Sequence, residues 1–200
     1  MRLTAAVTLA LAAPPAFSAD LSLIVDRSER GVEMFVKFPT GSTEALLAPF
    51  PAGFLASEGV VDIAPFRAGT ADHGDDLWRG VETRIGGETA LVEAMSMMVH
   101  PDSLPVDFND PVDGWIAMAV CNVVGDDTLF GVDVLSTYAG YIAWEVAGHD
   151  RVEIAFPSTM EIKVTEFLEG REIHHAELTV GPDAPLTLDP VTRWERWRLW

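Results

Sequence analysis

The 200-residue sequence contains one cysteine, few basic residues and, beyond its first residues, no long apolar run. With Cys121 alone, no disulfide can form within the chain, so a hydrophobic core must stabilise the fold. Lysine and arginine together number 13 against 31 aspartate and glutamate residues, and the formal net charge is −18. The charge alone therefore argues against binding to nucleic acid or to an anionic membrane. It is typical of a solvated acidic surface that keeps the protein soluble, and a cationic partner or cation binding are the alternatives.

The first 18 residues have the pattern of a cleavable secretory signal. Arg2 precedes an apolar run over residues 3–13, which is shorter than the roughly 20 apolar residues that a membrane-spanning helix needs. Ala16 and Ser18 place small side chains at positions −3 and −1 of a cut before residue 19. We therefore expect a signal peptide over residues 1–18 and a periplasmic location for the exported chain. A cut one residue later is the alternative.

The expected mature chain, residues 19–200, has the composition of one globular domain. Cleavage of the signal peptide removes one basic residue and no acidic residue, so the net charge becomes −19. This segment contains no repeat, no low-complexity tract and no apolar run long enough to span a bilayer. The sequence thus predicts a single acidic domain without a transmembrane segment.

Apolar alternation and turn residues predict a fold made mainly of β-strands. Three hairpins are expected: Leu21–Asp26 with Val32–Phe38, Val81–Ile85 with Glu88–Val92, and Met160–Leu168 with Glu172–Val180. In the last hairpin, the register that best matches apolar residues pairs Ile162 with Leu178, Val164 with Ala176, Phe167 with Ile173, and Lys163 with Glu177. The nearly continuous apolar run Trp115–Val124 predicts a central strand that is covered on both faces.

Helical spacing is confined to short segments. Tyr138–Val146 places apolar residues on one side, and Asp189, which is followed by proline, can cap a C-terminal helix. The segment Pro39–Asp76 is expected to form loops with a short helix near Thr43–Leu47. The predicted fold is all-β or β-dominated α+β: a single antiparallel β-sandwich-like domain with one or two short helices.

Met95, Met97, Met98 and His100 form a cluster of soft metal ligands. Thioethers select Cu(I), and imidazole also binds copper, so this cluster is a candidate copper site. Strand alternation would place Met95 and Met97 on one face and Met98 and His100 on the other. The alternative is that the methionines fill gaps in the core. A blue-copper ligand run is absent after Cys121, which argues against that type of copper protein.

His174 and Glu166 face each other in the expected hairpin register, and such a pair could orient a general base in a small hydrolase or lyase. A solvent-exposed ion pair is the alternative. Two acidic segments, Asp72–Asp76 and Asp107–Gly114, concentrate oxygen ligands of the kind that calcium binds. Asx turns explain both segments as well. Cys121 lies in an apolar run, where a thiol is usually inert packing.

Residues 193–200 form the one locally basic patch of the sequence and are rich in tryptophan. Trp194, Trp197 and Trp200 recur every three residues among arginines, a composition typical of partner-binding sites and of membrane interfaces. The alternative is a terminal element that is packed on the sheet. The sequence favours an exported, non-catalytic module that acts through a protein partner. A periplasmic copper-binding protein and a small hydrolase or lyase are the other hypotheses.

Overall fold

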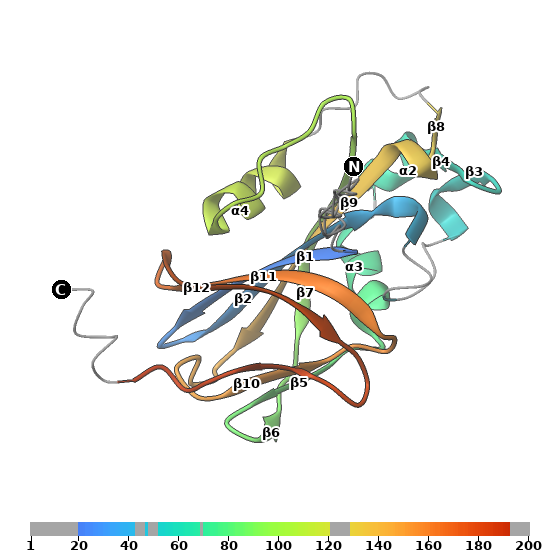
Figure 1. Cartoon of the computed structure of the whole chain (residues 1–200). Coiled ribbons are helices and arrows are strands. Elements are labelled where there is room, and N and C mark those ends of the chain that lie inside the picture. Colours follow the sequence, from blue (N-terminus) through green and yellow to red (C-terminus); the bar gives the residue numbers. More distant parts are fainter. Residues whose placement is uncertain (1–19, 43–46, 48–51, 69, 121–128, 193–200) are drawn as a thin grey trace, which may run out of the picture.

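The computed structural model describes residues 20–42, 47, 52–68, 70–120 and 129–192 (Figure 1). The structure is 53% strand and 17% helix, which confirms the predicted β-sandwich-like domain with few short helices. The described helices are α2 (Ile63–Ala68), α3 (Thr70–Trp78) and α4 (Pro111–Ala119), and short 3-10 turns occupy Thr40–Ser42, Ala52–Phe54 and Val132–Val134. Within these ranges, no helix has the length and apolar character needed to cross a bilayer.

The strands form three sheets. The largest contains, in spatial order, β12 (Arg171–Val180), β11 (Met160–Leu168), β1 (Leu21–Ser28), β2 (Gly31–Pro39), β9 (Leu135–Trp144) and β7 (Glu93–Pro101). The second contains β13 (Leu186–Leu188), β10 (Val152–Ala155), β5 (Glu82–Ile85) and β6 (Glu88–Thr89). The third contains β3 (Leu55–Ser57), β4 (Val60–Asp62) and β8 (Leu129–Gly131).

The first two predicted hairpins form at the predicted turns, but the second strand of the second hairpin, β6, ends at Thr89 and not at Val92 as predicted. In the β1–β2 hairpin, Ser28 pairs with Gly31, and the two residues between them make the turn. In the β5–β6 hairpin, Gly86 and Gly87 have positive φ angles of 62° and 89°. A tight two-residue turn of type I′ needs positive φ at both positions, which glycine adopts without strain.

The β11–β12 hairpin follows the predicted register over most of its length. The confirmed pairs are Ile162 with Leu178, Val164 with Ala176, and Lys163 with Glu177. A β-bulge after Glu166 then shifts the pairing by one residue, so Phe167 lies opposite Glu172 and not opposite Ile173 as predicted. The shift leaves a two-residue loop that ends in Gly170, and both loop residues have positive φ. The preference for this compact turn explains the change of register at the tip.

One strand pair departs from the antiparallel arrangement that we expected. β1 and β11 are parallel, with Leu21 opposite Ile162 and Arg27 opposite Leu168. Parallel neighbours need a long connection, and most of the chain lies between these two strands. Apolar alternation predicts which face of a strand is buried, but it does not specify the neighbouring strand or its direction.

The predicted helix over Tyr138–Val146 is wrong, because residues 138–144 belong to β9. Ala139 and Tyr141 face the main core, while Tyr138 faces the other side of the sheet. Tyr138 is nevertheless only 1% exposed. Because β9 is covered on both faces, its apolar residues do not alternate with polar ones, and their spacing imitates that of a helix.

The predicted strand over Trp115–Val124 is also wrong, because residues 115–119 belong to α4. The rest of that range lies mostly outside the described residues, as does most of the predicted helix near Thr43–Leu47. The segment Pro39–Asp76, which was expected to be mainly loops, contains two strands and two helices instead. Asp189 begins no helix within the described residues, since residues 189–192 have no regular structure.

The main core lies between one face of the six-stranded sheet and a layer formed by the four-stranded sheet and α3 (Figure 1). Trp78 of α3 packs on Tyr141, with ring centroids 4.3 Å apart, and on Phe156 at 6.2 Å. The Tyr141 hydroxyl donates to the carbonyl of Gly74 at 3.1 Å, and burial raises the pKa of Tyr141. The opposite face of the large sheet carries a smaller apolar cluster beneath α4, formed by Ile24, Phe35, Met118 and Phe167.

Candidate functional site

α4 has a start that is fixed by local contacts. Asp110 caps the helix, because its Oδ1 accepts a hydrogen bond from the Asp113 backbone N at 2.9 Å. Pro111 occupies the first turn, where a missing N–H group leaves no helical bond unmade. Asp113 Oδ2 accepts from the backbone N of Asn109 at 2.9 Å and from its Nδ2 at 3.1 Å. The start of α4 therefore does not depend on its apolar side chains, which are left for packing.

The inner side of α4 lies very close to the six-stranded sheet. A Cβ on Gly114 would be 2.5 Å from Cγ of Phe35 on β2. A Cβ on Gly140 of β9 would be 2.4 Å from Sδ of Met118. Two glycines, one on the helix and one on the sheet, thus allow this close approach and bury the inner side of α4.

The outer side of α4 is apolar and exposed. Val112, Trp115, Ile116 and Val120, named here the α4 stripe, have exposed fractions from 41% to 64%. Their spacing of three and four residues places them on one side of the helix. A helix that is apolar on both sides is normally covered on both sides. The α4 stripe is therefore the candidate binding site of this protein (Figure 1 shows α4 on the open side of the large sheet).

Acidic groups lie beside the α4 stripe. Trp115 Nε1 donates to Glu33 Oε2 at 3.2 Å, and Asp26 is the direct cross-strand neighbour of Glu33. Burial raises the pKa of the Asp26 carboxyl, and the charges of Glu33 and Glu169 act in the same direction, while a hydrogen bond from Gly170 opposes them. No basic residue lies in the last turn of α4. Lys37 lies on the same face of the sheet, with its Nζ 5.3 Å from the ring centroid of Tyr138. Only the Trp115 end of the stripe, beside Glu33 and Asp26, therefore favours a cationic ligand.

β7 divides the predicted copper ligands between the two apolar clusters. The strand has a bulge at Met95, which packs into the cluster beneath α4, whereas Met97 lies in the main core. The expectation that Met95 and Met97 share one face is therefore wrong. Met118, which was not among the predicted ligands, lies beside Met95 over Gly140. Copper binding by the Met/His cluster stays a prediction.

Met98 pairs with Tyr138 of β9 and packs against the main core, and His100 pairs with Ser136. His100 is 1% exposed, and its Nε2 donates to the carbonyl of Ala117 in α4 at 2.6 Å. Burial lowers the pKa of His100, the hydrogen bond to Ala117 opposes this shift, and the charge of Lys37 adds to it. Among the described residues, Nδ1 has no hydrogen-bond partner. The neutral imidazole therefore connects β7 to the last turn of α4.

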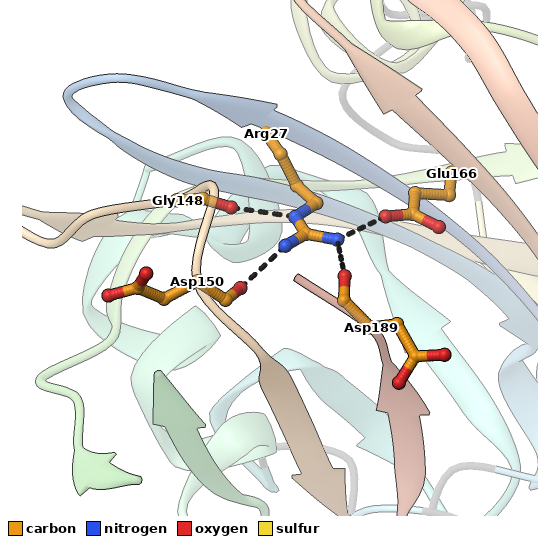
Figure 2. Close-up of polar contacts among 5 residues, drawn as sticks. All are labelled: Arg27, Gly148, Asp150, Glu166 and Asp189. Atoms are coloured by element: carbon orange, nitrogen blue, oxygen red, sulfur yellow. Dashed lines mark hydrogen bonds and ion pairs between the residues drawn. The ribbon is translucent and has the colours of Figure 1, made fainter. Parts of the chain in front are cut away.

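Glu166 and His174 lie directly opposite each other, as the predicted register requires. The side chain bound to Glu166 is, however, Arg27 of β1, whose Nη1 donates to Glu166 Oε1. Arg27 is fully buried. As Figure 2 shows, its guanidinium also donates to three backbone carbonyls, those of Gly148 at 2.6 Å, Asp150 at 2.5 Å and Asp189 at 2.8 Å. We call these four contacts the Arg27 clamp.

A pocket of about 230 Å³ borders the Arg27 clamp. Its lining includes Glu166, His174, Thr187 and Asp189. Within the described part of the chain, no hydrogen bond joins His174 to Glu166, and the His174 side chain is exposed. A general base needs a partner that orients it, and here the carboxylate is engaged by Arg27 instead.

The two predicted calcium segments have different structures. Asp72–Asp76 lies in α3, and not in the turn that was expected. Asp107–Gly114 contains the N-terminus of α4, where its carboxylates bind backbone N–H groups as Asx turns do. Across the described ranges, no group of three or more His, Cys, Asp or Glu side chains could hold a metal ion. Cys121, the predicted signal peptide at residues 1–18, and Trp194, Trp197 and Trp200 lie outside the described residues.

Comparison with known proteins adds no relative. No protein-family model matches the chain, and a search of curated proteins finds no match. The fold and the site together define a strand-dominated, β-sandwich-like domain that carries an exposed apolar helix. The function must therefore be argued from the α4 stripe and its surroundings.

Proposed function

We propose that this protein is an exported, non-catalytic binding module that holds a protein partner on the α4 stripe. The observation that carries the proposal is the exposure of Val112, Trp115, Ile116 and Val120 on a helix whose other side is already packed. Tryptophan is enriched among the residues that dominate binding energy at protein interfaces. Trp115 is also held in place, because its ring packs edge-on against Phe35 at 5.8 Å and its Nε1 is bound to Glu33. A side chain held in this way loses little conformational entropy on binding.

The partner has an apolar centre and a cationic rim. Its apolar centre covers the α4 stripe, and its basic groups lie near Glu33 and Asp26. A second copy of this chain would bring another net charge of −18 to the interface, and an anionic membrane would be repelled in the same way. A catalytic role for Glu166 and His174 gains no support from the geometry, because Arg27 engages the carboxylate.

Two synthetic peptides of equal length test this chemistry. They share one face of leucine and tryptophan, and they differ in having either lysine and arginine or glutamate at the flanking positions. Their affinities for the purified protein are measured by isothermal titration calorimetry. We expect the cationic peptide to bind and the anionic peptide to bind at least tenfold more weakly.

Three variants locate the binding surface. Trp115→Ala and Ile116→Arg should weaken binding of the cationic peptide by about 30-fold or more, since truncating a central interface residue costs about 2 kcal/mol or more. Leu129→Ala is the matched control, because Leu129 is a 57% exposed apolar residue in the third sheet. Equal affinity of all three variants and the wild type would refute the proposal. Binding to neutral phosphatidylcholine vesicles that is lost only in Ile116→Arg would instead assign α4 to a membrane surface.

A further inference from the structure

We propose that His100 makes binding at the α4 stripe dependent on pH, so that a partner held at neutral pH is released in mildly acidic conditions. This inference rests on the proposed function, because it names how the same surface is regulated. Its support comes from the contact of His100 with the end of α4, from the surroundings of the imidazole ring, and from the ease with which the end of a helix opens.

His100 holds the C-terminal end of α4. The last carbonyls of a helix have no N–H partner in a following turn and need a donor from elsewhere. Ala117 is one of these residues, and its carbonyl accepts from Nε2 of His100 at 2.6 Å. Because His100 belongs to β7, this one hydrogen bond joins the end of the helix to the sheet. It therefore fixes the turn that carries Ile116 and Val120 of the α4 stripe.

The site of His100 favours the neutral ring. The residue is 1% exposed, and its Nδ1 is buried without a hydrogen-bond partner among the described residues. While Nε2 carries the proton that is donated to Ala117, Nδ1 of the neutral ring has a lone pair and no proton to donate. Protonation would add a donor and a positive charge at a position that is closed to water. A buried charge without a partner is strongly unfavourable.

The groups that touch the ring do not compensate such a charge. Tyr138 of β9 lies edge-on to the imidazole, with ring centroids 5.0 Å apart. Lys37 of β2 pairs with Tyr138 on the same face of the sheet, and its charge disfavours a second cation. The Ala117 carbonyl, at the negative end of the helix dipole, favours the charged ring. Burial outweighs this effect, so the pKa of His100 is lowered from its ordinary value.

The carboxylates of the neighbouring segments are directed elsewhere. Asp102 and Asp107, in the connection after β7, are exposed, and Asp102 accepts from Ser136 Oγ at 2.8 Å. Asp113 lies in the first turn of α4, where it binds the chain that precedes the helix. Among the described residues, no carboxylate therefore acts on the charge of His100. Protonation is favoured only when the ring leaves its site and releases the Ala117 carbonyl.

The end of a short helix opens at little free-energy cost, since fraying ends have opening free energies close to zero. The ring regains its ordinary pKa of 6.5 when it is released into water. Closure of the last turn is then about tenfold less favourable at pH 5.5 than at pH 7.5. A turn that is closed about three-quarters of the time at pH 7.5 would be closed about one-quarter of the time at pH 5.5. Partner affinity would fall about threefold, because only the closed form presents the complete stripe.

The first test measures the affinity of the cationic amphipathic peptide by calorimetry at pH 7.5 and at pH 5.5. In His100→Gln, the amide keeps a donor for the Ala117 carbonyl but does not titrate. We therefore expect the wild type to lose about threefold more affinity than His100→Gln over this range. His175→Gln is the matched control, because His175 is an exposed histidine on β12, and it should behave as the wild type does.

This comparison also separates His100 from the acidic groups beside Trp115. Protonation of Asp26 and Glu33 weakens binding of a cationic peptide as the pH falls, but it does so equally in all three proteins. The difference between the wild type and His100→Gln therefore measures the histidine. An equal loss of affinity in both would overturn the inference.

Hydrogen exchange reports the opening of α4 without a partner. The Val120 N–H donates to the Ile116 carbonyl at 2.9 Å in the last turn. After correction for the intrinsic exchange rate, its protection should fall about threefold between pH 7.5 and pH 5.5 in the wild type and stay constant in His100→Gln. Constant protection in the wild type would overturn the inference.

A third measurement needs no variant and keeps the inference testable if His100→Gln does not fold. Binding and protonation are reciprocal, so a peptide that binds only the closed form must lower the pKa of His100 further. The titration of His100 is followed by NMR in the free protein and at saturation with the peptide. An unchanged pKa would overturn the coupling.

The two proposals fail in different ways. Equal pH dependence of the wild type and His100→Gln would overturn the inference and leave the proposed function standing. A peptide that binds none of the proteins at either pH would count against the proposed function. Hydrogen exchange would in that case still decide whether His100 controls the end of α4.

Discussion

The Arg27 clamp joins four parts of the chain, and replacing Arg27 with methionine is the sharpest test of its contribution to stability. The substitution keeps an unbranched side chain of similar length but removes every donor. It leaves the Glu166 carboxylate, which is 6% exposed, without its cation. It also removes the donor from three backbone carbonyls in the β9–β10 connection and after β13.

The expected loss of stability is large for a protein of this size. A buried charge that loses its partner costs about 3–5 kcal/mol, and each bond between a charged donor and a carbonyl contributes about 1.5–3 kcal/mol. Water from the adjacent pocket can replace some of these bonds, so we expect a total loss of about 5 kcal/mol. With about 2–4 °C lost per kcal/mol, Tm should fall by roughly 10–20 °C.

Urea unfolding followed by circular dichroism gives the free energy of unfolding directly. Arg27→Lys keeps the charge but not the planar set of donors, so it should lose roughly half as much stability as Arg27→Met. This variant still gives a measurement if Arg27→Met does not fold. In the Arg27→Met background, Glu166→Gln should recover about 2–3 kcal/mol by removing the unpaired charge. A loss below about 1 kcal/mol in Arg27→Met, or no recovery in the double variant, would show that the clamp does not stabilise the fold as reasoned.

Two further predictions concern the contact between α4 and the sheet. Gly114→Ala should destabilise the protein by about 1–3 kcal/mol despite the better helix propensity of alanine, because the new Cβ would meet the Phe35 ring. Gly53→Ala is the control in the same urea titration, because a Cβ added there would have no atom within 4 Å. The folded state lowers the pKa of His100 below its ordinary value of 6.5, so the unfolded state takes up the proton more readily and stability should fall as pH drops below about 6.5. His100→Gln keeps a donor for the Ala117 carbonyl and should lose less stability between pH 7 and pH 5; an identical pH dependence in both proteins would contradict this cause.

The sequence was informative where one local signal decides the structure. Alternation and turn residues located both strands of three hairpins, and the pairing of Ile162 with Leu178 followed from matching apolar and charged positions. The tip of that hairpin differed because the turn preference of a residue pair ending in Gly170 outweighed one apolar match. Local rules thus specify hairpins, and competition between two such rules sets the last pairs.

The candidate site could not be predicted from periodicity. α4 is apolar on both sides, and this removes the alternation by which a helix is distinguished from a buried strand. The signal that was present is the Asp110–Pro111 pair, which caps and begins a helix immediately before the apolar run. The Arg27 clamp had no such signal, because its partners are defined only by the folded chain.

The spacing of the Arg27 clamp along the chain also sets the order in which the fold can be completed. Arg27 is separated from its acceptors by 121 residues at Gly148, 139 at Glu166 and 162 at Asp189. At roughly 5–20 residues per second of synthesis, the last acceptor follows Arg27 by roughly ten to thirty seconds. During that interval β1 lacks its parallel neighbour β11, and a guanidinium destined for the interior stays hydrated. The first hairpin therefore presents β1 as an open edge strand until β11 has been made.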